Sequence, residues 1–521
     1  MSKKKDPNRP LEFKGEILDN VHGFISYTEA EEAIMETPLF KRLQSLKQLS
    51  VINWVFPGSE HTRYTHSLGV MYIADKMAIS MGLSNKERRI LRMAGLLHDI
   101  GHYPLSHVGE SPYSVKFKRS TMTLTSPEKF CDAINTAVYK KIEGDQIARK
   151  TKLMRASDEH HHEAVGALIV QRNKEIRKII EGELGVGAAE VIADIITGNV
   201  DRKATLGMME TDPLWVQMMH SELDADGIDY IMRDSLLAGT GFGSGEIAQL
   251  IRCMRAVEHK ETGVRILCVE TKGVPAADQY LINKFFHYSQ VVFNKHIIIS
   301  EWMAQIVVAW MRDNNGIFAE KWMFPNKTKL DKWLANGGSD DYLKFTDHQF
   351  WTAVEEMRRS RRAPDHIKRF CEYLIDHEEP NMARREEIRI VSRNDQVIKD
   401  RLRRSETYEK KGILGPWITV LETRTMTKQM PEKDFEDYLK IYRKGKEEDM
   451  KKMTDMAERA KVEAEAEDFI AKSRIKRLMD CICVADVDGN ITVLCDHERS
   501  LMQDMYNETV AILRSYEMDF K

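Results

Sequence analysis

The stretch LLHDIGH, residues 96–102, decides how this sequence is interpreted. It ends an apolar segment with helical periodicity, and it places two potential metal ligands, His98 and Asp99, side by side. A further histidine, His66, lies upstream in HTRYTHSLGV (61–70), and the aspartate-rich segment LDADGIDYIMRD (223–234) lies downstream. Imidazole and carboxylate ligands together suit a first-row divalent cation, which polarises phosphoryl oxygens and lowers the pKa of bound water. The sequence therefore predicts a metal site for hydrolytic phosphate chemistry.

The composition is that of a folded protein, with 42% hydrophobic and 31% charged residues in 521. A net charge of −3 creates no global attraction for nucleic acid. No apolar run approaches the roughly 20 residues that cross a bilayer, and the basic start MSKKKDPNRP is not followed by the apolar core of a secretory signal. The odd count of seven cysteines favours a reducing compartment. We therefore expect a cytoplasmic protein without a membrane partner.

Hydrophobic periodicity predicts a mostly α-helical chain. We expect a catalytic core over 1–310, with an insertion at about 111–158, followed by a smaller mixed α+β region over 311–521 with a regulatory or oligomerisation role. The strand-like pieces are VRILCV (264–269), IRIVS (388–392) and a hairpin around Asp488-Gly489. The expected helices include residues 28–49, 66–82, 85–99, 162–181, 188–197, 222–237, 280–311, much of the charged stretch 425–475, and 497–515.

Four blocks of the chain carry a family resemblance: KRLQSLKQL (41–49), VFPGSEHTRYTHSLGV (55–70), GLLHDIGHYPLSH (95–107) and LDADGIDYIMRDS (223–235). Together they resemble the HD-domain phosphohydrolases and, within them, the deoxynucleoside triphosphate triphosphohydrolases, which include the bacterial dGTPases. The resemblance implies an HD-domain helical core. It also implies metal-dependent hydrolysis of a deoxynucleoside triphosphate (dNTP) to a deoxynucleoside and inorganic triphosphate.

By this resemblance, one divalent ion is bound by His66, His98, Asp99 and Asp226. Spacing alone leaves Asp224 as a competitor for the last position. The family pattern of Asp, two residues, Asp-Tyr, two residues, Arg-Asp favours Asp226. The sequence does not distinguish Mn, Fe, Zn, Mg and Ni, and additional Mg could arrive with the substrate. The plainer interpretation, that the histidines are structural, is less consistent with the joint pattern.

The same resemblance implies a shell of catalytic residues beside the metal: His102, His107, Glu110 and His162. His107 is the expected proton donor to the leaving sugar oxygen, since a histidine transfers protons near neutral pH. Glu110 is expected to orient His107. Because His160 and His161 precede His162, the register of this last histidine stays open. Each histidine could also be a solvated or structural residue.

The implied substrate contacts are Arg63 on the phosphates, Gln48 and Asp234 on the sugar 3′-hydroxyl, and Leu49 and Tyr230 beside the sugar ring. A guanidinium suits polyphosphate because it binds bidentately and keeps its charge. An apolar wall at Leu49 would leave a 2′-hydroxyl unpaired, which discriminates only modestly. Ordinary helix packing would explain several of these residues equally well.

The chain departs from the family at three residues. Gly227 stands where an Arg or Lys is frequent, and Phe293 and Asn294 stand where a tyrosine-containing helix closes the pocket. These departures put base and sugar selectivity in question but leave the metal ligands intact. Cys481, Cys483 and Cys495 could suggest zinc, although buried strand cysteines are the simpler interpretation because no fourth ligand is near.

The expected partners are the dNTP substrate and, by family analogy, other copies of the chain in a homo-oligomer. The basic clusters RRSRRAP (358–364) and 399–405 could bind a regulatory nucleotide or single-stranded nucleic acid, though solvated helix faces explain them as well. Two alternative functions stay open. One is a different HD phosphohydrolase acting on a nucleoside monophosphate, cyclic nucleotide or alarmone. The other is a nucleotide- or nucleic-acid-sensing protein with a vestigial site.

Overall fold

The structure is a computed structural model and describes residues 6–114, 160–200, 209–243, 245–314, 324–380, 382–391, 400, 417–425, 430–451, 456–505 and 508–517. Helices dominate these residues, which confirms the mostly α-helical prediction. The predicted insertion lies almost wholly outside the described residues. The helices up to residue 313 are α1 (Glu29–Met35), α2 (Pro38–Lys41), α3 (Arg63–Ser80), α4 (Asn85–Leu97), α5 (His107–Ser114), α8 (His162–Arg172), α9 (Lys174–Leu184), α10 (Ala188–Thr197), α11 (Pro213–His220), α12 (Ala225–Leu237), α13 (Ile247–Arg252), α14 (Val274–Phe286) and α15 (Lys295–Asp313).

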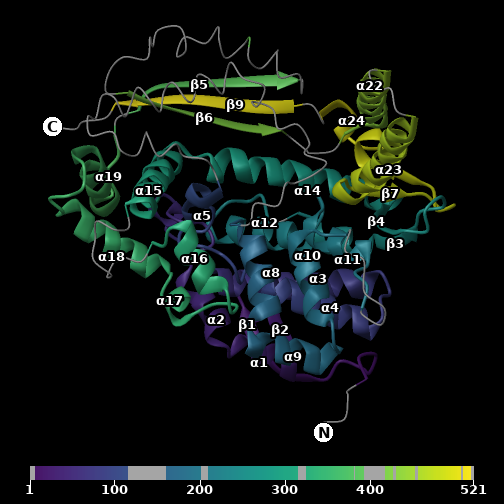
Figure 1. Cartoon of the computed structure of the whole chain (residues 1–521), viewed down its shortest axis with the longest axis horizontal. Coiled ribbons are helices and arrows are strands. Elements are labelled where there is room, and N and C mark those ends of the chain that lie inside the picture. The colour runs from purple at the N-terminus through teal and green to yellow at the C-terminus, as the bar shows by residue number, and fades with distance from the viewer. Residues whose placement is uncertain are drawn as a thin grey trace.

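Helices α3, α4 and α12 form the frame of the candidate site. α3 packs along α4 and against α12, and a single buried hydrophobic cluster runs through all three helices. α4 begins at a capping box in which the Ser84 hydroxyl accepts a hydrogen bond from the Glu87 N–H. A hairpin of β1 (Phe13–Asp19) and β2 (Gly23–Thr28) lies next to these helices (Figure 1). The apolar stripe of α4 therefore ends in the interior at His98.

The single helix expected over 28–49 is wrong in extent. α1 ends at Met35, α2 starts at Pro38, and a 3-10 turn follows over Arg42–Ser45. The break has a local cause, because proline lacks an N–H and disfavours a helical conformation in the residue before it. Thr37 instead caps α2 by accepting a hydrogen bond from the Phe40 N–H.

A four-stranded sheet joins distant parts of the sequence in the order β3 (Met254–Glu258), β4 (Arg265–Glu270), β7 (Cys483–Ala485) and β8 (Ile491–Val493). β7 and β8 form the hairpin predicted around Asp488-Gly489, with Gly489 at a left-handed φ of 76°. β4 pairs in parallel with β7, so residues from both sides of position 310 share one sheet. The division into domains at residue 310 stays a prediction.

The helix expected over 497–515 is wrong: a short helix, α24 (Met502–Met505), is followed by β9 (Glu508–Glu517). β9 is the central strand of an antiparallel sheet with β5 (Met382–Val391) and β6 (Trp417–Thr425). Figure 1 shows this sheet above α14 and α15, and hydrogen bonds from Arg514 to Phe293 O and from Tyr516 to Lys295 O attach it there. Pairing on both edges overrides the helical pattern of this segment.

The long helix expected over 280–311 is interrupted. α14 continues into a π-helical segment, His287–Val292, and α15 begins at Lys295 after a bend of 69°. The Asn294 side chain caps α15 by accepting a hydrogen bond from the His296 N–H. Within the described ranges, no single helix is long and apolar enough to cross a membrane. The two halves of this bent pair meet that criterion only when they are joined.

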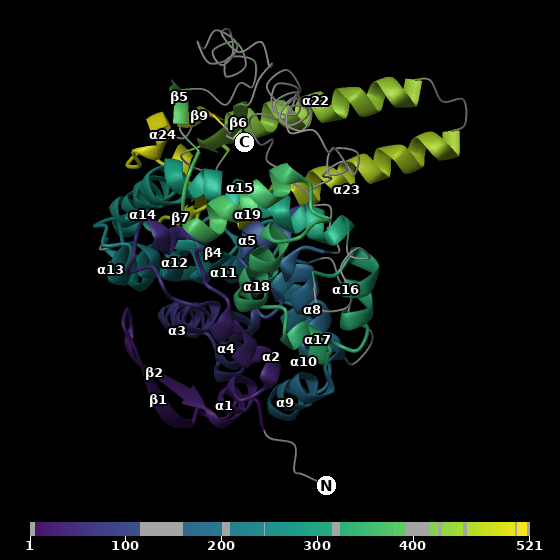
Figure 2. The same cartoon turned by 90° about the vertical axis from the view of Figure 1, so that its left-hand side faces the viewer.

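The remaining helices are α16 (Lys327–Leu334), α17 (Asp340–Leu343), α18 (Asp347–Arg358), α19 (Asp365–Asp376), α22 (Glu432–Lys451) and α23 (Met456–Asp480). α22 and α23 account for much of the charged stretch that was predicted to be helical. They run side by side and project from the rest of the chain (Figure 2). A small apolar cluster of Phe435, Leu439 and Ile470 joins them.

Candidate metal and phosphate site

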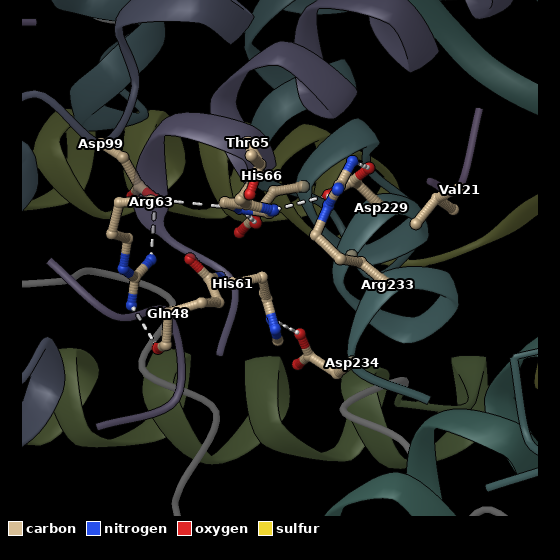
Figure 3. A network of polar contacts seen from close by, with 12 residues as sticks. Val21, Gln48, His61, Arg63, Thr65, His66, Asp99, Asp229, Arg233 and Asp234 are labelled. Atoms are coloured by element: carbon tan, nitrogen blue, oxygen red, sulfur yellow. Dashed lines mark hydrogen bonds and ion pairs between the residues drawn. The ribbon is translucent and has the colours of Figure 1, made fainter. Parts of the chain in front are cut away.

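His66 lies in the first turn of α3 and is fully buried. Its Nε2 atom is 2.9 Å from Asp226 Oδ1 and 3.8 Å from Asp99 Oδ2. Its Nδ1 atom is 2.7 Å from Asp229 Oδ2. Figure 3 shows the His66 ring between Asp99 on one side and Asp229 on the other. Metal-binding histidines commonly donate their second N–H to a carboxylate, which fixes the tautomer. Asp229 therefore turns Nε2 of His66 toward Asp99 and Asp226.

His98 caps the C-terminus of α4. Its Nδ1 atom lies 2.8 Å from the Gly95 carbonyl oxygen, to which it must donate because a carbonyl only accepts. Its Nε2 atom is buried and has no hydrogen-bond partner, while Asp99 Oδ1 lies 3.4 Å and Asp226 Oδ1 3.8 Å away. The lone pair of this nitrogen is therefore available to a metal ion.

The two aspartates that compete for the last ligand position have different surroundings. Asp224 is the N-cap of α12, and its carboxylate accepts a hydrogen bond from the Gly227 N–H over 2.6 Å. Asp226 lies in the first turn of α12, and its side chain approaches His66 and His98 while staying 38% exposed. The geometry thus favours Asp226 beside the two histidines and gives Asp224 a capping role.

The charges of this cluster favour a bound cation. Burial lowers the pKa of His66, but hydrogen bonds with Asp226 and Asp229 outweigh it and raise the pKa to about 10. Burial of Asp99 opposes ionisation, yet Arg63 and the neighbouring histidines hold its pKa below the ordinary value. Potential ligand atoms of His66, His98 and Asp99 lie within 4.8 Å of one another. The residues present therefore fit a divalent metal ion, and Asp226 Oδ1 lies beside the two histidines.

The predicted catalytic residues form a second cluster next to the first. The rings of His102 and His162 stack at 3.9 Å, and His107 lies at 5.0 and 5.2 Å from them. Glu110 Oε2 is 3.1 Å from His107 Nδ1 and 3.0 Å from His162 Nδ1. A distance of 3.3 Å between His102 Nε2 and Asp99 Oδ1 connects the two clusters. The structure thus brings all four residues together.

The neighbours of His162 clarify the register of the histidine run. His160 turns away, with Nε2 3.1 Å from Asp331 Oδ1, whereas His161 Nε2 lies 3.2 Å from Glu110 Oε1. His162 therefore faces the site, and His161 is a neighbour that the sequence did not single out.

Protonation differs within the histidine cluster. Burial lowers the pKa of His162, but the Glu110 carboxylate outweighs burial and raises it overall. Burial, together with Arg63, lowers the pKa of His102 well below its usual value. The pKa of Glu110 is lowered, because His162 and His107 outweigh its burial. His107 has a side chain that is 67% exposed, so it lies on the open side of the cluster.

Arg63 lies beside Asp99 at the start of α3 and is almost fully buried. Its guanidinium donates to Asp99 Oδ2 over 2.7 Å and to the Gln48 carbonyl over 3.4 Å (Figure 3). It also donates to the Ser106 hydroxyl over 2.9 Å. A guanidinium has five N–H donors, so these contacts leave donors for a phosphate. Gln48 is also buried, and its side-chain oxygen has no hydrogen-bond partner.

The other three residues predicted near the sugar occupy different surroundings. Leu49 packs against an apolar cluster that includes Ile52 and Ile297. Tyr230 is half-buried, with its ring 5.6 Å from that of His287. Asp234 is buried, and its two oxygens lie 2.8 Å from His61 Nε2 and 3.1 Å from His287 Nε2. These two histidines were not predicted; His61 stands within a recognised block, whereas no local pattern marks His287.

A buried ion-pair network behind the metal cluster was also missed. Arg233 donates to Asp229 and to Asp19, and the His22 ring contacts the same Asp229 carboxylate. Asp226, Asp229 and Arg233 follow one another at intervals of three and four residues, so they share one face of α12. The spacing of these three residues could have indicated the network from the sequence. Nothing in the sequence indicated that Asp19 and His22 of the β1–β2 hairpin join it.

The departures from the family pattern have structural counterparts. A side chain at position 227 would meet the Tyr280 hydroxyl at 2.5 Å, and the Lys284 ammonium lies 3.8 Å from the same point. A positive charge is therefore present near Gly227, supplied by α14. Phe293 and Asn294 occupy the bend before α15, where Asn294 serves as a helix cap.

Cys481, Cys483 and Cys495 are buried free cysteines, and burial raises the pKa of Cys481 to about 12. Their burial agrees with the simpler interpretation, but only Cys483 lies in a strand, because Cys481 precedes β7 and Cys495 lies in a 3-10 turn over Leu494–Asp496. In the first basic cluster, Arg358 and Arg359 pair with Glu355. The second cluster lies outside the described residues except for position 400.

Comparison with known families places residues 63–134 in the HD domain. An uncharacterized protein of Mycoplasma pneumoniae is 28% identical over 294 residues, which cover 56% of this chain and 57% of that protein. An uncharacterized protein of Methanocaldococcus jannaschii is 27% identical over 292 residues, covering 56% and 49% of the two chains. The match thus spans about half the length of these relatives.

The deoxynucleoside triphosphate triphosphohydrolase SAMHD1 of Bos taurus is 42% identical over 99 residues, covering 18% of this chain and 17% of that enzyme. Among solved structures, a phosphohydrolase of Bacteroides thetaiotaomicron superposes with a TM-score of 0.58 and 17% identity. The superposition covers 97% of this chain and 100% of that chain. A hypothetical protein of Aquifex aeolicus gives a TM-score of 0.57 and 18% identity, with 96% of each chain covered. These two structures share the fold. Residues 63–134 of the chain therefore match the HD domain, and His66, His98 and Asp99 lie inside the matched segment.

Proposed function

We propose that this chain is a metal-dependent phosphohydrolase that converts a dNTP to a deoxynucleoside and inorganic triphosphate. The observation that carries the proposal is the meeting of two clusters at Asp99: a metal-ligand set and a histidine–glutamate set, 3.3 Å apart. The HD domain supports a metal-dependent hydrolase. The similarity to SAMHD1, confined to the same region, supports a dNTP as the substrate.

In this proposal the metal is bound by His66, His98, Asp99 and Asp226. A bound divalent ion would polarise the α-phosphate and lower the pKa of a water molecule. Arg63 neutralises phosphate charge with its remaining N–H donors. Asp234 accepts a hydrogen bond from the 3′-hydroxyl, Gln48 contacts the same hydroxyl, and Leu49 and Tyr230 flank the sugar.

The bond between the α-phosphorus and the sugar 5′-oxygen breaks when water attacks the phosphorus. His107 is the proposed proton donor to the departing oxygen: it acts as an imidazolium, whose Nδ1–H donates to Glu110 and whose Nε2–H faces the substrate. His102, whose pKa burial lowers well below its usual value, and His162, whose pKa the Glu110 carboxylate raises, hold the phosphate from the other side. The products are a deoxynucleoside and triphosphate.

The test is product analysis with each of the four dNTPs and four rNTPs in Mn²⁺ or Mg²⁺, resolved by ion-pair chromatography. The His98→Ala, Asp99→Ala double variant should lose both products. A matched double variant at the exposed residues His348 and Asp340, each changed to Ala, should keep the activity.

The products decide between the alternatives. Deoxynucleoside with intact triphosphate supports the proposal. Orthophosphate, or hydrolysis of monophosphates, cyclic nucleotides or alarmones instead, would assign a different HD phosphohydrolase. No turnover with any nucleotide, alone or mixed, combined with nucleotide or salt-dependent single-strand binding, would assign a sensing protein. Light scattering with and without nucleotide would test the proposed homo-oligomer and a regulatory nucleotide in the same samples.

A further inference from the structure

The loop between α4 and α5, which carries His102 and leads into His107, ends in a strained conformation. Leu105 and Ser106 are consecutive non-glycine residues with φ of 57° and 56°. The left-handed region costs an L-residue about 1–2 kcal/mol, so such a pair persists only where neighbouring groups hold it. His107 follows directly, and its position therefore depends on whatever stabilises this loop.

The holding group comes from the C-terminal half of the chain. Asp347, the first residue of α18, accepts a hydrogen bond from the Leu105 N–H over 2.7 Å. Its second oxygen accepts one from the Lys47 N–H over 2.8 Å. The Ser106 hydroxyl in turn donates to the Lys47 carbonyl over 2.7 Å. Asp347, Lys47 and the pair 105–106 thus form a closed ring of hydrogen bonds.

This ring lies next to two predicted site residues, the substrate contact Gln48 and the proton donor His107. Gln48 follows Lys47, and His107 follows Ser106. The Ser106 hydroxyl also accepts a hydrogen bond from Arg63, which pairs with Asp99. Nearby, Arg42 donates to the His102 and Phe345 carbonyls over 2.6 and 2.7 Å, which ties the histidine loop to the segment before α18.

We infer that Asp347 is a positioning residue: its carboxylate aligns the His107 loop with the Gln48 segment and thereby sets the geometry of the active site. The inference rests on the proposed function for its effect on turnover, but the ring of hydrogen bonds is testable without substrate. Asp347 touches none of the proposed metal ligands.

The ionisation of Asp347 provides a second signature. Burial raises its pKa to about 6, although hydrogen bonds from the Lys47 and Leu105 N–H groups oppose this shift. The charged groups that face it are Lys47, whose ammonium pairs with Glu60, and Arg42. A protonated carboxyl has one oxygen that accepts poorly, so one of the two N–H contacts weakens as pH falls through about 6.

The experiment compares Asp347→Asn with Asp365→Asn. Asp365 is the first residue of α19, so the control removes the same charge at the same helix position on an exposed side chain. Hydrogen–deuterium exchange at pH 7.5 should rise at least tenfold in peptides spanning 100–110 and 44–50 of Asp347→Asn only. Turnover should fall 10- to 100-fold, mainly in kcat, as expected for a small misplacement of catalytic groups. Wild-type turnover should decline as pH falls through about 6, and the Asp347→Asn profile should lack this decline.

Unchanged exchange in both segments, or equal changes in the two variants, would overturn the inference whether or not the protein hydrolyses dNTPs. If the wild type has no dNTPase activity but the exchange result holds, only the proposed function fails. Should Asp347→Asn unfold, Ser106→Ala opens the same ring from the opposite side. Increased exchange at 44–50 in that variant supports the ring, and unchanged exchange there refutes it.

Discussion

Asp229 Oδ2 lies 2.7 Å from Nδ1 of His66, and this contact determines which nitrogen of His66 faces the other potential ligands. Because Asp229 also accepts from Arg233, its carboxylate stays ionised and oriented. The pKa of Asp229 is held well below the ordinary value, since Arg233, His22 and His66 outweigh the effect of its burial. The metal site thus depends on a carboxylate that is not itself a proposed ligand.

Asp229→Asn should weaken metal binding 10- to 100-fold, because the amide no longer fixes the His66 tautomer as a carboxylate does. Titration with Mn²⁺ followed by calorimetry measures this directly. The control is Asp376→Asn, which removes an exposed carboxylate paired with Arg358. Equal metal affinities in the two folded variants would contradict the assigned role of Asp229.

Glu110→Gln should lower kcat by about 10²- to 10³-fold with little effect on KM, because His107 loses the carboxylate that orients it. The Glu110 charge also raises the pKa of His162, so that pKa should fall in the variant. An NMR titration of the histidine ring protons would detect the fall. Glu36→Gln, at an exposed carboxylate, serves as the control. A normal kcat in Glu110→Gln would exclude this orienting role.

Asp234 makes stability depend on pH. Hydrogen bonds from His287 and His61 outweigh the burial of this carboxyl and lower its pKa to about 2. A lowered folded-state pKa stabilises the protein above the unfolded-state pKa near 4, and the contribution is lost as pH falls through about 2. Asp234→Asn should therefore be about 2 kcal/mol less stable at pH 5, with the difference shrinking toward pH 2. Urea denaturation across this range would show a constant difference if the shift is absent.

Leu49→Ala should reduce the preference for dNTPs over rNTPs about tenfold, since an apolar wall rejects an added hydroxyl only modestly. The measurement is the ratio of kcat/KM for each dNTP and its ribonucleotide. Val55→Ala alters the same apolar cluster away from the proposed sugar contact and should leave the ratio unchanged. If both variants change the ratio equally, general loosening of the cluster is the cause.

Local sequence was sufficient where neighbouring residues decide the outcome. The periodicity over residues 85–99 predicted that His98 and Asp99 end an apolar helix, and α4 is that helix. The hairpin at Asp488-Gly489 followed from its turn residues. In each case the information lies within a few turns of helix or one pair of strands.

Tertiary structure decided everything that depends on which distant segments meet. The segment predicted to be the last helix is a strand because β5 and β6 satisfy both of its edges. Spacing could not decide whether Asp224 or Asp226 lies with the potential metal ligands. The packing of α12 on α3 brings Asp226 to His66, whereas Asp224 caps α12. Asp347 contacts Leu105, which lies 242 positions earlier in the chain. Periodicity encodes the buried face of an element, whereas the identity of the partner on that face emerges only when the whole core packs.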